Sequence, residues 1–378
     1  MIDRSESLQA ILRVDNLDGA VVALPQHVYY FSGHRPGTSG TGHKPIPWGY
    51  WFFVLGPNKR LLVVPLGDEQ LSGTLRSGVE SFSYKADSSE HLVDERRAAS
   101  TALGRAVAEA GLTGKNVGVE AADLGFEFAE EIRKVADVTS LGNQIETMRL
   151  QKDDEEMSLI RRAAGILDRG FETARQAIRP GVSEQEVYAA IYRAVLLENK
   201  ESFILDVIFA SGVNTAGRLT PPTDRVLAES DLFLVDLYPV LNMYKADMTR
   251  MFVAGHPLEW QLKMHAVLED AMLLAERALR PGVSASEPDA IVRRCIFDAG
   301  YGDYIVHHAG HGLGLTHPER PFIAPWDEME LQERMVISIE PGIYIPGLGG
   351  MRVEQNYFIW SDGAESLSQV PLELFACV

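Results

Sequence analysis

Five side chains in the C-terminal half of the chain have the types and spacing of a metal site; in chain order they are Asp236, Asp247, His311, Glu340 and Glu354. Two carboxylates neutralise one divalent ion, so four carboxylates in one site indicate two cations. Four carboxylates and one imidazole form a hard ligand set, which favours Mn(II), Fe(II), Co(II) or Zn(II) over metals that prefer thiolates. The chemistry expected of such a site is hydrolysis, with a water that bridges the two ions as the nucleophile.

Length and composition place this chemistry in a globular protein of two domains. The 378 residues suffice for two separate cores, and a composition of 46% hydrophobic and 23% charged residues excludes disorder. A formal net charge of −18 argues against a nucleic-acid partner, because the protein would repel a phosphate backbone. The start of the chain lacks the pattern of a signal peptide and no apolar run could span a membrane, so we expect a cytoplasmic protein.

The N-terminal part, residues 1–145, has the alternating pattern of an α/β domain. The short β-branched or aromatic runs GAVVAL, YWFFVL and RLLVVP predict strands, and EHLVDERRAASTALGRAVAEAGL and LGFEFAEEIRKV have helical periodicity on either side of the strand NVGVE. A long loop over residues 34–51 carries Trp48 and Trp51. Loops of this length are usually functional or mobile, and its aromatic rings are able to contact a cationic substrate.

Residues 146–378 form the second predicted domain, which begins with a long amphipathic helix over 146–178 and contains an internal repeat. The segment AIRPGVSEQEV is echoed about a hundred residues later by ALRPGVSASEP. Each copy predicts a capping box, formed by Ser183 with Glu186 and by Ser284 with Glu287. A helix and then apolar strands with carboxylates follow each copy, which predicts two related α+β units that face one cleft.

The apolar strands explain how the acidic side chains converge. Asp236 follows LFLV and Glu340 follows VISI, which places each carboxylate at the end of a buried strand. Glu354 lies within RVEQNYFIW, where a charge is costly unless it is paired or bound to a metal. One such acid is commonly a solvated strand end, but the joint pattern, with His311 on a strand of the second unit, favours a metal site.

These motifs resemble those of the pita-bread metalloenzymes, a family that includes prolidase, aminopeptidase P, methionine aminopeptidase and creatinase. The matching motifs are D-x(10)-D followed by Met-Thr-Arg, then Gly-His-Gly-Leu-Gly, Glu-Pro-Gly and Arg-x-Glu-Gln-Asn, together with HVYYFSGH near the N-terminus. The resemblance covers the whole chain and is closest to Xaa-Pro dipeptidase-like members. It implies an α+β fold with a C-terminal pita-bread domain (146–378) and an N-terminal creatinase-type α/β domain (1–145).

The resemblance also implies a role for each ligand. Asp236 chelates one ion, and Asp247 and Glu354 bridge both ions. His311 and Glu340 complete the coordination of the other ion. Glu340 is further expected to accept a proton from the bridging water during its attack.

Two residues are expected to support these ligands. Thr249 lies two residues beyond Asp247 and is expected to orient that carboxylate. Arg352 lies two residues before Glu354, on the same face of the strand, and is a candidate catalytic residue. It could order the cleft, hold a substrate carboxylate or form a structural ion pair, and the sequence leaves all three open.

Two histidines that peptidases of this family place near the scissile bond are missing here. Leu219 stands five residues after Asn214, and Pro318 stands seven residues after His311, where those peptidases have histidine. His307 matches a further histidine near the substrate in aminopeptidase P, and it is expected to be catalytic. His308 beside it and His317, one place before Pro318, are expected to bind substrate, although His317 could equally be a loop residue in solvent. Tyr238 replaces a common glycine on the same strand face as Asp236, so it should narrow the pocket and bind a small substrate.

Three functions remain open from these residues. The first is a dinuclear metal-dependent hydrolase of a C–N bond, either an Xaa-Pro dipeptidase or an aminopeptidase-like enzyme. The second keeps the metals, most simply manganese but also cobalt, zinc or iron, and acts on a small non-peptide compound, as in ectoine hydrolysis or a sulfonium lyase. The third is a binding module without catalysis; the retained ligands argue against it, because clustered acids are destabilising without cations.

Relatives commonly form homodimers, so a homodimer is expected, with the loop over residues 34–51 near the cleft of the partner subunit. The substrate is expected to be a short peptide or small molecule. The two cysteines, Cys295 and Cys377, are expected to be free thiols rather than a disulfide.

Overall fold

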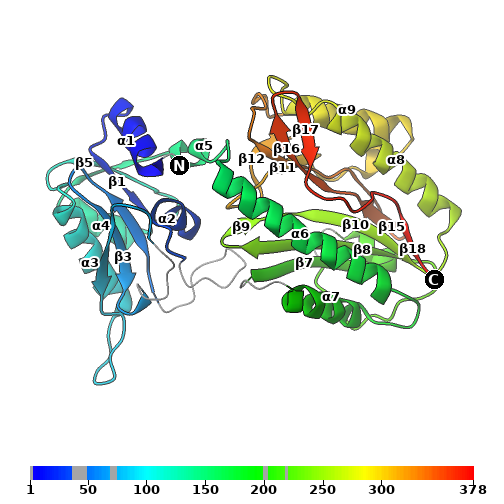
Figure 1. Ribbon diagram of the computed structural model, residues 1–378, viewed down its shortest axis with the longest axis horizontal. Helices are drawn as coiled ribbons and strands as arrows, with labels where there is room; N and C mark the ends of the chain where they lie inside the picture. Colours follow the sequence, from blue (N-terminus) through cyan, green and yellow to red (C-terminus); the bar gives the residue numbers. More distant parts are fainter. Residues whose placement is uncertain (1–2, 36–48, 69–74, 199–202, 218–219) are drawn as a thin grey trace. The chain divides into compact units, whose positions relative to one another are not determined.

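The computed structural model describes residues 3–35, 49–68, 75–198, 203–217 and 220–378. Within these ranges the chain divides into two compact units, Met1–Arg149 and Leu150–Val378 (Figure 1). The predicted helix over 146–178 is broken, because α5 (Gln144–Met148) ends before α6 (Asp154–Ala177) begins. Asp153 accounts for the break, since its carboxylate accepts the backbone N–H of Glu156 and starts a new helix there.

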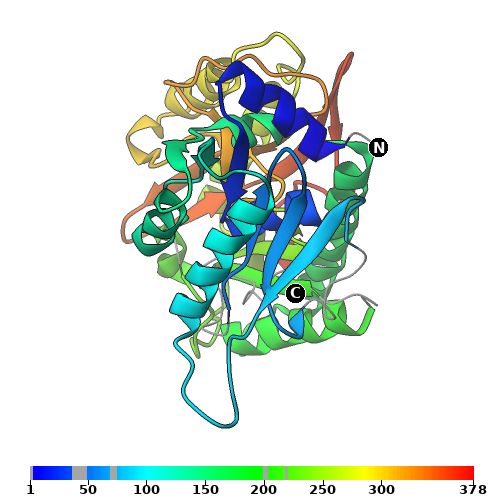
Figure 2. The ribbon, with the colours of Figure 1, turned by 90° about the vertical axis from the view of Figure 1, so that its left-hand side faces the viewer.

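The N-terminal unit is a mixed six-stranded sheet with helices on both faces (Figure 2). Its strand order is β4-β3-β2-β1-β5-β6, with bounds β1 (Gly19–Val22), β2 (Phe52–Leu55), β3 (Arg60–Pro65), β4 (Val79–Tyr84), β5 (Asn116–Val119) and β6 (Asp137–Ser140). The other helices are α1 (Arg4–Val14), α2 (Pro25–Ser32), α3 (Glu95–Glu109) and α4 (Phe126–Arg133). Alternation along β2 serves both faces, because Phe52 packs in the core under α3 while Phe53 stacks on Phe31 of α2. The predicted α/β domain is confirmed.

The C-terminal unit has two halves, each with a pair of helices and a largely antiparallel sheet. In the first half, α6 and α7 (Glu184–Glu198) accompany a sheet of order β18-β10-β8-β7, to which β9 (Tyr244–Lys245) adds at β8. Its strands are β7 (Phe203–Ser211), β8 (Asp231–Leu241), β10 (Met248–Ala254) and β18 (Phe375–Cys377), and the short 3-10 helix η2 (Gly212–Ala216) follows β7. The chain's last strand therefore completes the first half.

In the second half, α8 (Glu259–Glu276) and α9 (Ser286–Asp298) accompany a sheet of order β12-β11-β13-β16-β17. Its strands are β11 (Gly310–Gly312), β12 (Glu319–Ile323), β13 (Val336–Ile339), β16 (Gln355–Trp360) and β17 (Gly363–Ser366). A hairpin of β14 (Gly342–Ile345) and β15 (Gly349–Arg352) and the turn η3 (Gly302–Tyr304) complete it.

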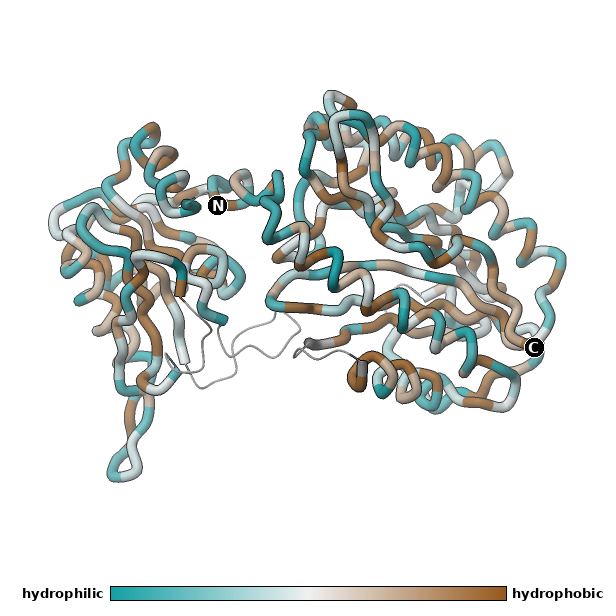
Figure 3. Tube along the Cα trace, in the orientation of Figure 1, coloured by the Kyte–Doolittle hydropathy of each residue, from teal (hydrophilic) through white to brown (hydrophobic). Residues whose placement is uncertain are grey.

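Amphipathic helices close the core of this unit. Along α6 the buried residues include Ile160, Ala163, Leu167 and Phe171, at the three- and four-residue spacing of one helix face. Figure 3 shows the resulting alternation of hydrophobic and hydrophilic residues along this helix. Each large apolar side chain removed from water contributes about 1.5–3 kcal/mol. Over the described residues, none of the helices combines the length and apolar character needed to cross a membrane.

The sequence repeat is also a structural repeat. In the first copy, the Gly181 N–H donates to the Leu227 carbonyl at 2.9 Å, and the Leu227 N–H donates to Val182 at 2.8 Å. In the second copy, the Gly282 N–H donates to the Leu331 carbonyl at 2.9 Å, and the Leu331 N–H donates to the Val283 carbonyl at 2.8 Å. The same turn thus leads into α7 and α9.

The two copies differ at their helix starts. The predicted capping box at Ser183 is confirmed, because its hydroxyl accepts the Glu186 N–H at 3.2 Å and its N–H donates to the Glu186 carboxylate at 2.7 Å. The box predicted at Ser284 is wrong, since α9 has Ala285 at its N-cap and the Ser284 hydroxyl instead contacts that of Ser286 at 2.8 Å. The helix starts later in the second copy. The thiols of Cys295 and Cys377 are free, as expected.

This difference predicts unequal costs for one substitution at two matched positions. Ser183→Ala removes an N-cap and is expected to lower the free energy of unfolding by about 1 kcal/mol. Ser284→Ala serves as the matched control and should cost clearly less, because Ala285 is the N-cap of α9 and the Ser284 hydroxyl accepts the Ser286 N–H only at a long 3.4 Å. Urea unfolding followed by circular dichroism measures both changes. Equal losses in the two variants would contradict the assignment of the cap.

Candidate metal centre

Strands of both halves place the predicted ligands. Asp236 lies on β8 directly opposite Thr249 of β10, and Asp247 immediately precedes β10. Asp236 is predicted at a strand end, but β8 continues to Leu241 because β7 pairs with it from Phe233 to Leu241. Its carboxylate therefore leaves the middle of a sheet face rather than an open end.

The second half supplies the remaining three predicted ligands. His311 is the central residue of β11, Glu340 directly follows β13, and Glu354 directly precedes β16. In the register of the sheet His311 pairs with Ser338, and Ser338 pairs with Asn356 on the other side. The three segments are therefore adjacent strands of one sheet, which fixes the spacing of their side chains.

The carboxylates converge although they come from different sheets. One oxygen from each of Asp236, Asp247 and Glu354 lies within 4.8 Å of the others, and the three residues are 1–2% exposed. Glu340 Oε1 lies 3.7 Å from His311 Nε2, which is itself 3.5 Å from Asp247 Oδ2. The structure thus brings all five predicted ligands together, and their roles as ligands stay predictions.

Hydrogen bonds orient these groups. The Nδ1 atom of His311 lies 2.9 Å from the Gly312 carbonyl, so this nitrogen carries the proton and the Nε2 lone pair faces Asp247. The hydroxyl of Thr249 donates to Glu354 Oε2 at 2.9 Å, and that of Ser338 donates to Glu354 Oε1 at 2.6 Å. Thr249 was expected to orient Asp247, and this prediction is wrong because its hydroxyl crosses to the other sheet.

Two supporting residues were missed in the sequence. Ser338 is one, and Asn356 is the other: its amide accepts the Asp247 N–H at 2.9 Å and donates to the Asp247 carbonyl at 2.6 Å. Asn356 lies two residues after Glu354, and this spacing along an extended segment is the signal that could have found it.

Arg352 is committed to protein groups. Its guanidinium forms an ion pair with Asp236, donates to the Tyr344 hydroxyl at 2.9 Å and donates to the Thr249 hydroxyl at 3.1 Å. Its Nε also lies 3.9 Å from Glu340 Oε2. Tyr238 donates its hydroxyl to the same Asp236 oxygen at 2.5 Å. One side of Asp236 is thus held by a cation and a phenol.

The electrostatics of the cluster test whether cations fit it. Burial, followed by the charges of Asp236 and Glu340, raises the pKa of Asp247 well above its usual value. Burial and the charges of Asp247 and Asp236 likewise raise the pKa of Glu354 well above its usual value. Among the described residues, the Oδ1 atoms of Asp236 and Asp247 are buried without a hydrogen-bond partner. Ionised carboxylates in this setting require cations, and the unpartnered oxygens fit divalent ions.

The remaining histidines lie beside this cluster. His308 Nδ1 lies 3.6 Å from Glu340 Oε1, and His307 Nε2 lies 3.0 Å from the Tyr344 hydroxyl. Both histidines border a space of about 10 Å³ beside Glu340, which is room for about one water. His317 is not a solvent-facing loop residue, because its Nε2 contacts Asp247 Oδ2. Burial lowers the pKa of His317 to about 4.

Other residues singled out in the sequence lie outside the described part of the chain or away from the cluster. Leu219 and most of the loop over residues 34–51, including Trp48, lie outside the described residues. Trp51 is 4% exposed and its indole donates to Asp68 at 3.1 Å, so the expectation that it contacts a cationic substrate is wrong for this unit. Pro318 separates His317 from β12.

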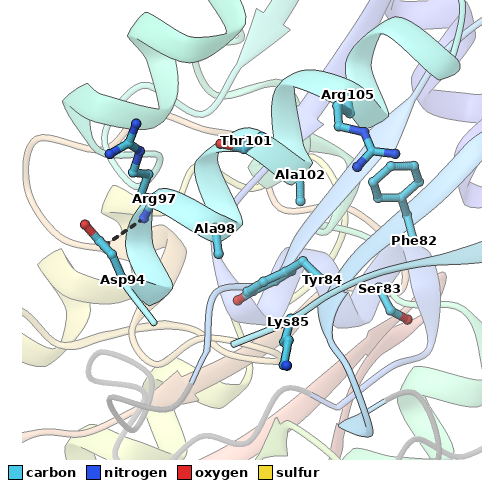
Figure 4. A pocket seen from close by; sticks show the side chains of 10 residues that line it. All are labelled: Phe82, Ser83, Tyr84, Lys85, Asp94, Arg97, Ala98, Thr101, Ala102 and Arg105. Carbon is cyan, nitrogen blue, oxygen red and sulfur yellow. Dashed lines mark hydrogen bonds between the residues drawn. The ribbon is translucent and has the colours of Figure 1, made fainter. Parts of the chain in front are cut away.

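A larger cavity exists in the N-terminal unit, but its chemistry differs. It measures about 490 Å³ and lies between β4 and α3 (Figure 4). Lys85, Arg97 and Arg105 make its lining basic, and Asp94 is the single acid among the described lining residues. The Asp94 carboxylate caps α3 by accepting the Arg97 N–H at 3.0 Å. This cavity offers no ligand set for a divalent ion.

The buried carboxylates and imidazole, with further histidines beside them, are the site of a metal-dependent hydrolase. The chain belongs to metallopeptidase family M24, whose model matches residues 158–360, and residues 4–151 match the creatinase/prolidase N-terminal domain. It is therefore a metallohydrolase of peptide bonds, and the family implies divalent metal ions. The predicted family, fold class and enzymatic nature are confirmed, and the hypothesis of a non-catalytic binding module is set aside.

Similar proteins match over nearly the whole chain. The chain is 33% identical to an Xaa-Pro dipeptidase of Pyrococcus furiosus over 99% of this chain and 100% of that one. It is 30% identical to an Xaa-Pro dipeptidase of Pyrococcus horikoshii over 99% of both. The prolidase structure from Pyrococcus furiosus superposes with a TM-score of 0.81 at 29% identity, covering 96% of this chain and 99% of that one. An Xaa-Pro dipeptidase structure from Bacillus anthracis gives 0.84 at 25% identity over 98% of both.

The hydroxyl of Tyr238 provides a test of how Asp236 is held. Tyr238→Phe keeps the ring and removes the hydrogen bond, so Asp236 loses a partner that fixes its carboxylate. We expect the affinity for Co(II) to fall about 10-fold, the scale usual for groups that orient metal ligands. Calorimetric titration of the metal-free protein measures this, with Tyr192→Phe on exposed α7 as the matched control. An affinity equal to that of the control would contradict the prediction.

Proposed function

We propose that this protein is a dinuclear metallopeptidase that cleaves Xaa-Pro dipeptides. The observation that carries the proposal is the convergence of four carboxylates and the His311 imidazole, with two buried oxygens that have no hydrogen-bond partner in the part of the chain that the structure describes. The names of the relatives supply the substrate class, since the two Pyrococcus proteins are Xaa-Pro dipeptidases. We assign residues 146–378 as the catalytic domain and residues 1–145 as the creatinase-like domain.

The proposed ligand roles are those that the family resemblance implies, and the grouping of the side chains supports them. Asp236, Asp247 and Glu354 would hold one ion, and Asp247, Glu354, His311 and Glu340 would hold the other. The set contains mainly oxygens, which supports manganese, with cobalt, zinc or iron as the other candidates. When bound, such ions would supply Lewis acidity and would lower the pKa of a bound water towards neutrality.

The proton transfers are assigned to residues around the small space beside the cluster. Glu340 is the most open of the four acids, with 13% of its side chain exposed, and it can accept a proton from the attacking water. His307 and His308 lie on the same side and can protonate the leaving nitrogen, in place of the histidines absent at positions 219 and 318. Arg352 then acts by holding Asp236 and Tyr344 in place, rather than by touching substrate.

Aromatic rings continue from this space and support an apolar substrate group. The ring of His308 lies 5.5 Å from that of Phe322, and Phe322 lies 5.4 Å from Trp326. Trp326 is 65% exposed, so this array leads from the cluster towards solvent. A proline ring would find an apolar wall there.

A second candidate is hydrolysis of a small non-peptide amide at the same site. Two observations favour it: Tyr238 is bulkier than the glycine common at its position, and Arg352 is occupied by protein groups. A dipeptidase has to bind the terminal carboxylate of its substrate, and the buried Arg352 does not offer a free guanidinium for that.

Activity against a mixed panel separates the two candidates. We expect the manganese-loaded enzyme to cleave Xaa-Pro dipeptides, to leave Xaa-Ala dipeptides largely intact and to lose all activity with chelator. Glu340→Gln should lower kcat by about 10²- to 10⁴-fold, because it removes the proton acceptor. Liquid chromatography of the products measures both. Cleavage confined to small cationic amides would favour the second candidate, and inertness of the loaded enzyme towards the whole panel would defeat both.

We also propose that the protein is cytoplasmic and that it is a homodimer, as relatives of this family commonly are. Light scattering coupled to size-exclusion chromatography should give about twice the chain mass of 41.7 kDa. A monomer at the concentrations used for activity measurements would contradict the dimer.

A further inference from the structure

His317, which stands one residue before the position of the usual family histidine, contacts the acidic cluster. His317 lies in the loop between β11 and β12, and its Nε2 contacts Asp247 Oδ2. Donor atoms of Asp247, His311 and His317 all lie within 4.8 Å of one another. The rings of His311 and His317 are 4.8 Å apart between centroids. Two imidazole nitrogens therefore flank one carboxylate oxygen.

From this geometry we infer that His317 is a second imidazole ligand of the ion held by His311, so that the site has six protein ligands rather than five. The inference rests on the proposed function, because it assumes that the cluster holds divalent ions. It replaces the expectation that His317 binds substrate. It also gives one of the two ions two nitrogen ligands instead of one.

The segment around His317 is fastened on both sides. Glu319 accepts from Lys152 Nζ at 2.6 Å, and this pair is nearly inaccessible, with 2% and 10% of the two side chains exposed. The Thr316 hydroxyl donates to the other oxygen of Glu319 at 3.0 Å. The residues flanking His317 are thus tied to one another and to Lys152, which holds the turn in one shape. A ligand placed on a fixed turn loses little conformational freedom on binding a metal.

Tyr238 fixes the imidazole from the other side. Its ring centroid lies 5.0 Å from that of His317 with a tilt of 37°, while its hydroxyl bonds Asp236 at 2.5 Å. The His317 ring is thus held between Tyr238 and His311, and only 22% of the side chain is exposed. This leaves Nε2 directed at Asp247 rather than at solvent.

A second nitrogen ligand predicts a shift in metal preference. Imidazole suits zinc, copper, iron and nickel, whereas sets of carboxylates suit manganese, and a given site with nitrogen ligands generally binds Co(II) more tightly than Mn(II). Removal of the His317 imidazole should therefore weaken Co(II) binding more than Mn(II) binding. The affinity for Co(II) at one of the two ion positions should fall about 100-fold. This is the upper end of the range for groups that orient metal ligands without binding the ion themselves.

The test uses the full chain, freed of metal and titrated with cobalt(II) chloride and manganese(II) chloride. Calorimetry gives stoichiometry and affinity, and the visible absorption of the cobalt protein reports the number and type of ligands. His317→Gln and His317→Ala are compared with the wild type, with His311→Gln as a variant that loses a proposed ligand. His256→Gln is the matched control, because His256 is exposed and lies outside the cluster.

The expected result is a changed cobalt spectrum and weaker binding of one ion in both His317 variants, with His256→Gln like the wild type. A cobalt spectrum identical to that of the wild type would overturn the inference, even if affinity fell, because His317 would then only hold Asp247 through a hydrogen bond. A wild type that binds no cobalt would overturn the proposed function as well as this inference.

Discussion

The structure depends on the crowding of like charges away from water. Asp236, Asp247 and Glu354 are almost completely buried, and their oxygens lie within 4.8 Å of one another. Burial of ionised carboxylates so close together is costly, and one guanidinium, that of Arg352, cannot balance them. Divalent cations remove this cost, and the fold can be understood as a frame that keeps the acids together until the cations bind. Buried hydrogen bonds from Thr249 and Ser338 are part of this frame, because both hold Glu354.

The repeated architecture supplies the frame. Each half of the C-terminal unit begins with the same Arg-Pro-Gly turn and presents acids on antiparallel strands. Hydrogen bonds then connect the halves across the cluster: Asn356 of the second half grips the backbone of Asp247 in the first, and Arg352 reaches Asp236. The acids are therefore fixed relative to one another by contacts between the halves, and not by each strand alone.

The sequence predicts the fold class and the meeting of the five candidate ligands, because both follow from local patterns. Alternating apolar runs identify the strands, and a charge among them is rare enough to attract notice. The partners of those charges are not local. Spacing predicts that Thr249 orients Asp247, yet its hydroxyl donates to Glu354, more than a hundred residues away. The end of its apolar run predicts Asp236 at a strand end, but pairing with β7 extends the strand beyond it. Register between distant strands decides such contacts, and one sequence alone does not encode it in a readable way.

Two departures from the family pattern, far apart in the sequence, meet at one place in the structure. Tyr238 stands where glycine is common, and His317 stands one residue before the position of the usual histidine; their rings lie 5.0 Å apart. A glycine at 238 would leave the space beside His317 open, and the shifted imidazole would lose the surface that holds it near Asp247. The larger residue and the displaced histidine therefore make sense together, as one rearrangement of the cluster's open side. Because the Tyr238 hydroxyl also donates to Asp236, while His317 contacts Asp247, this rearrangement connects the two aspartates of the acidic cluster.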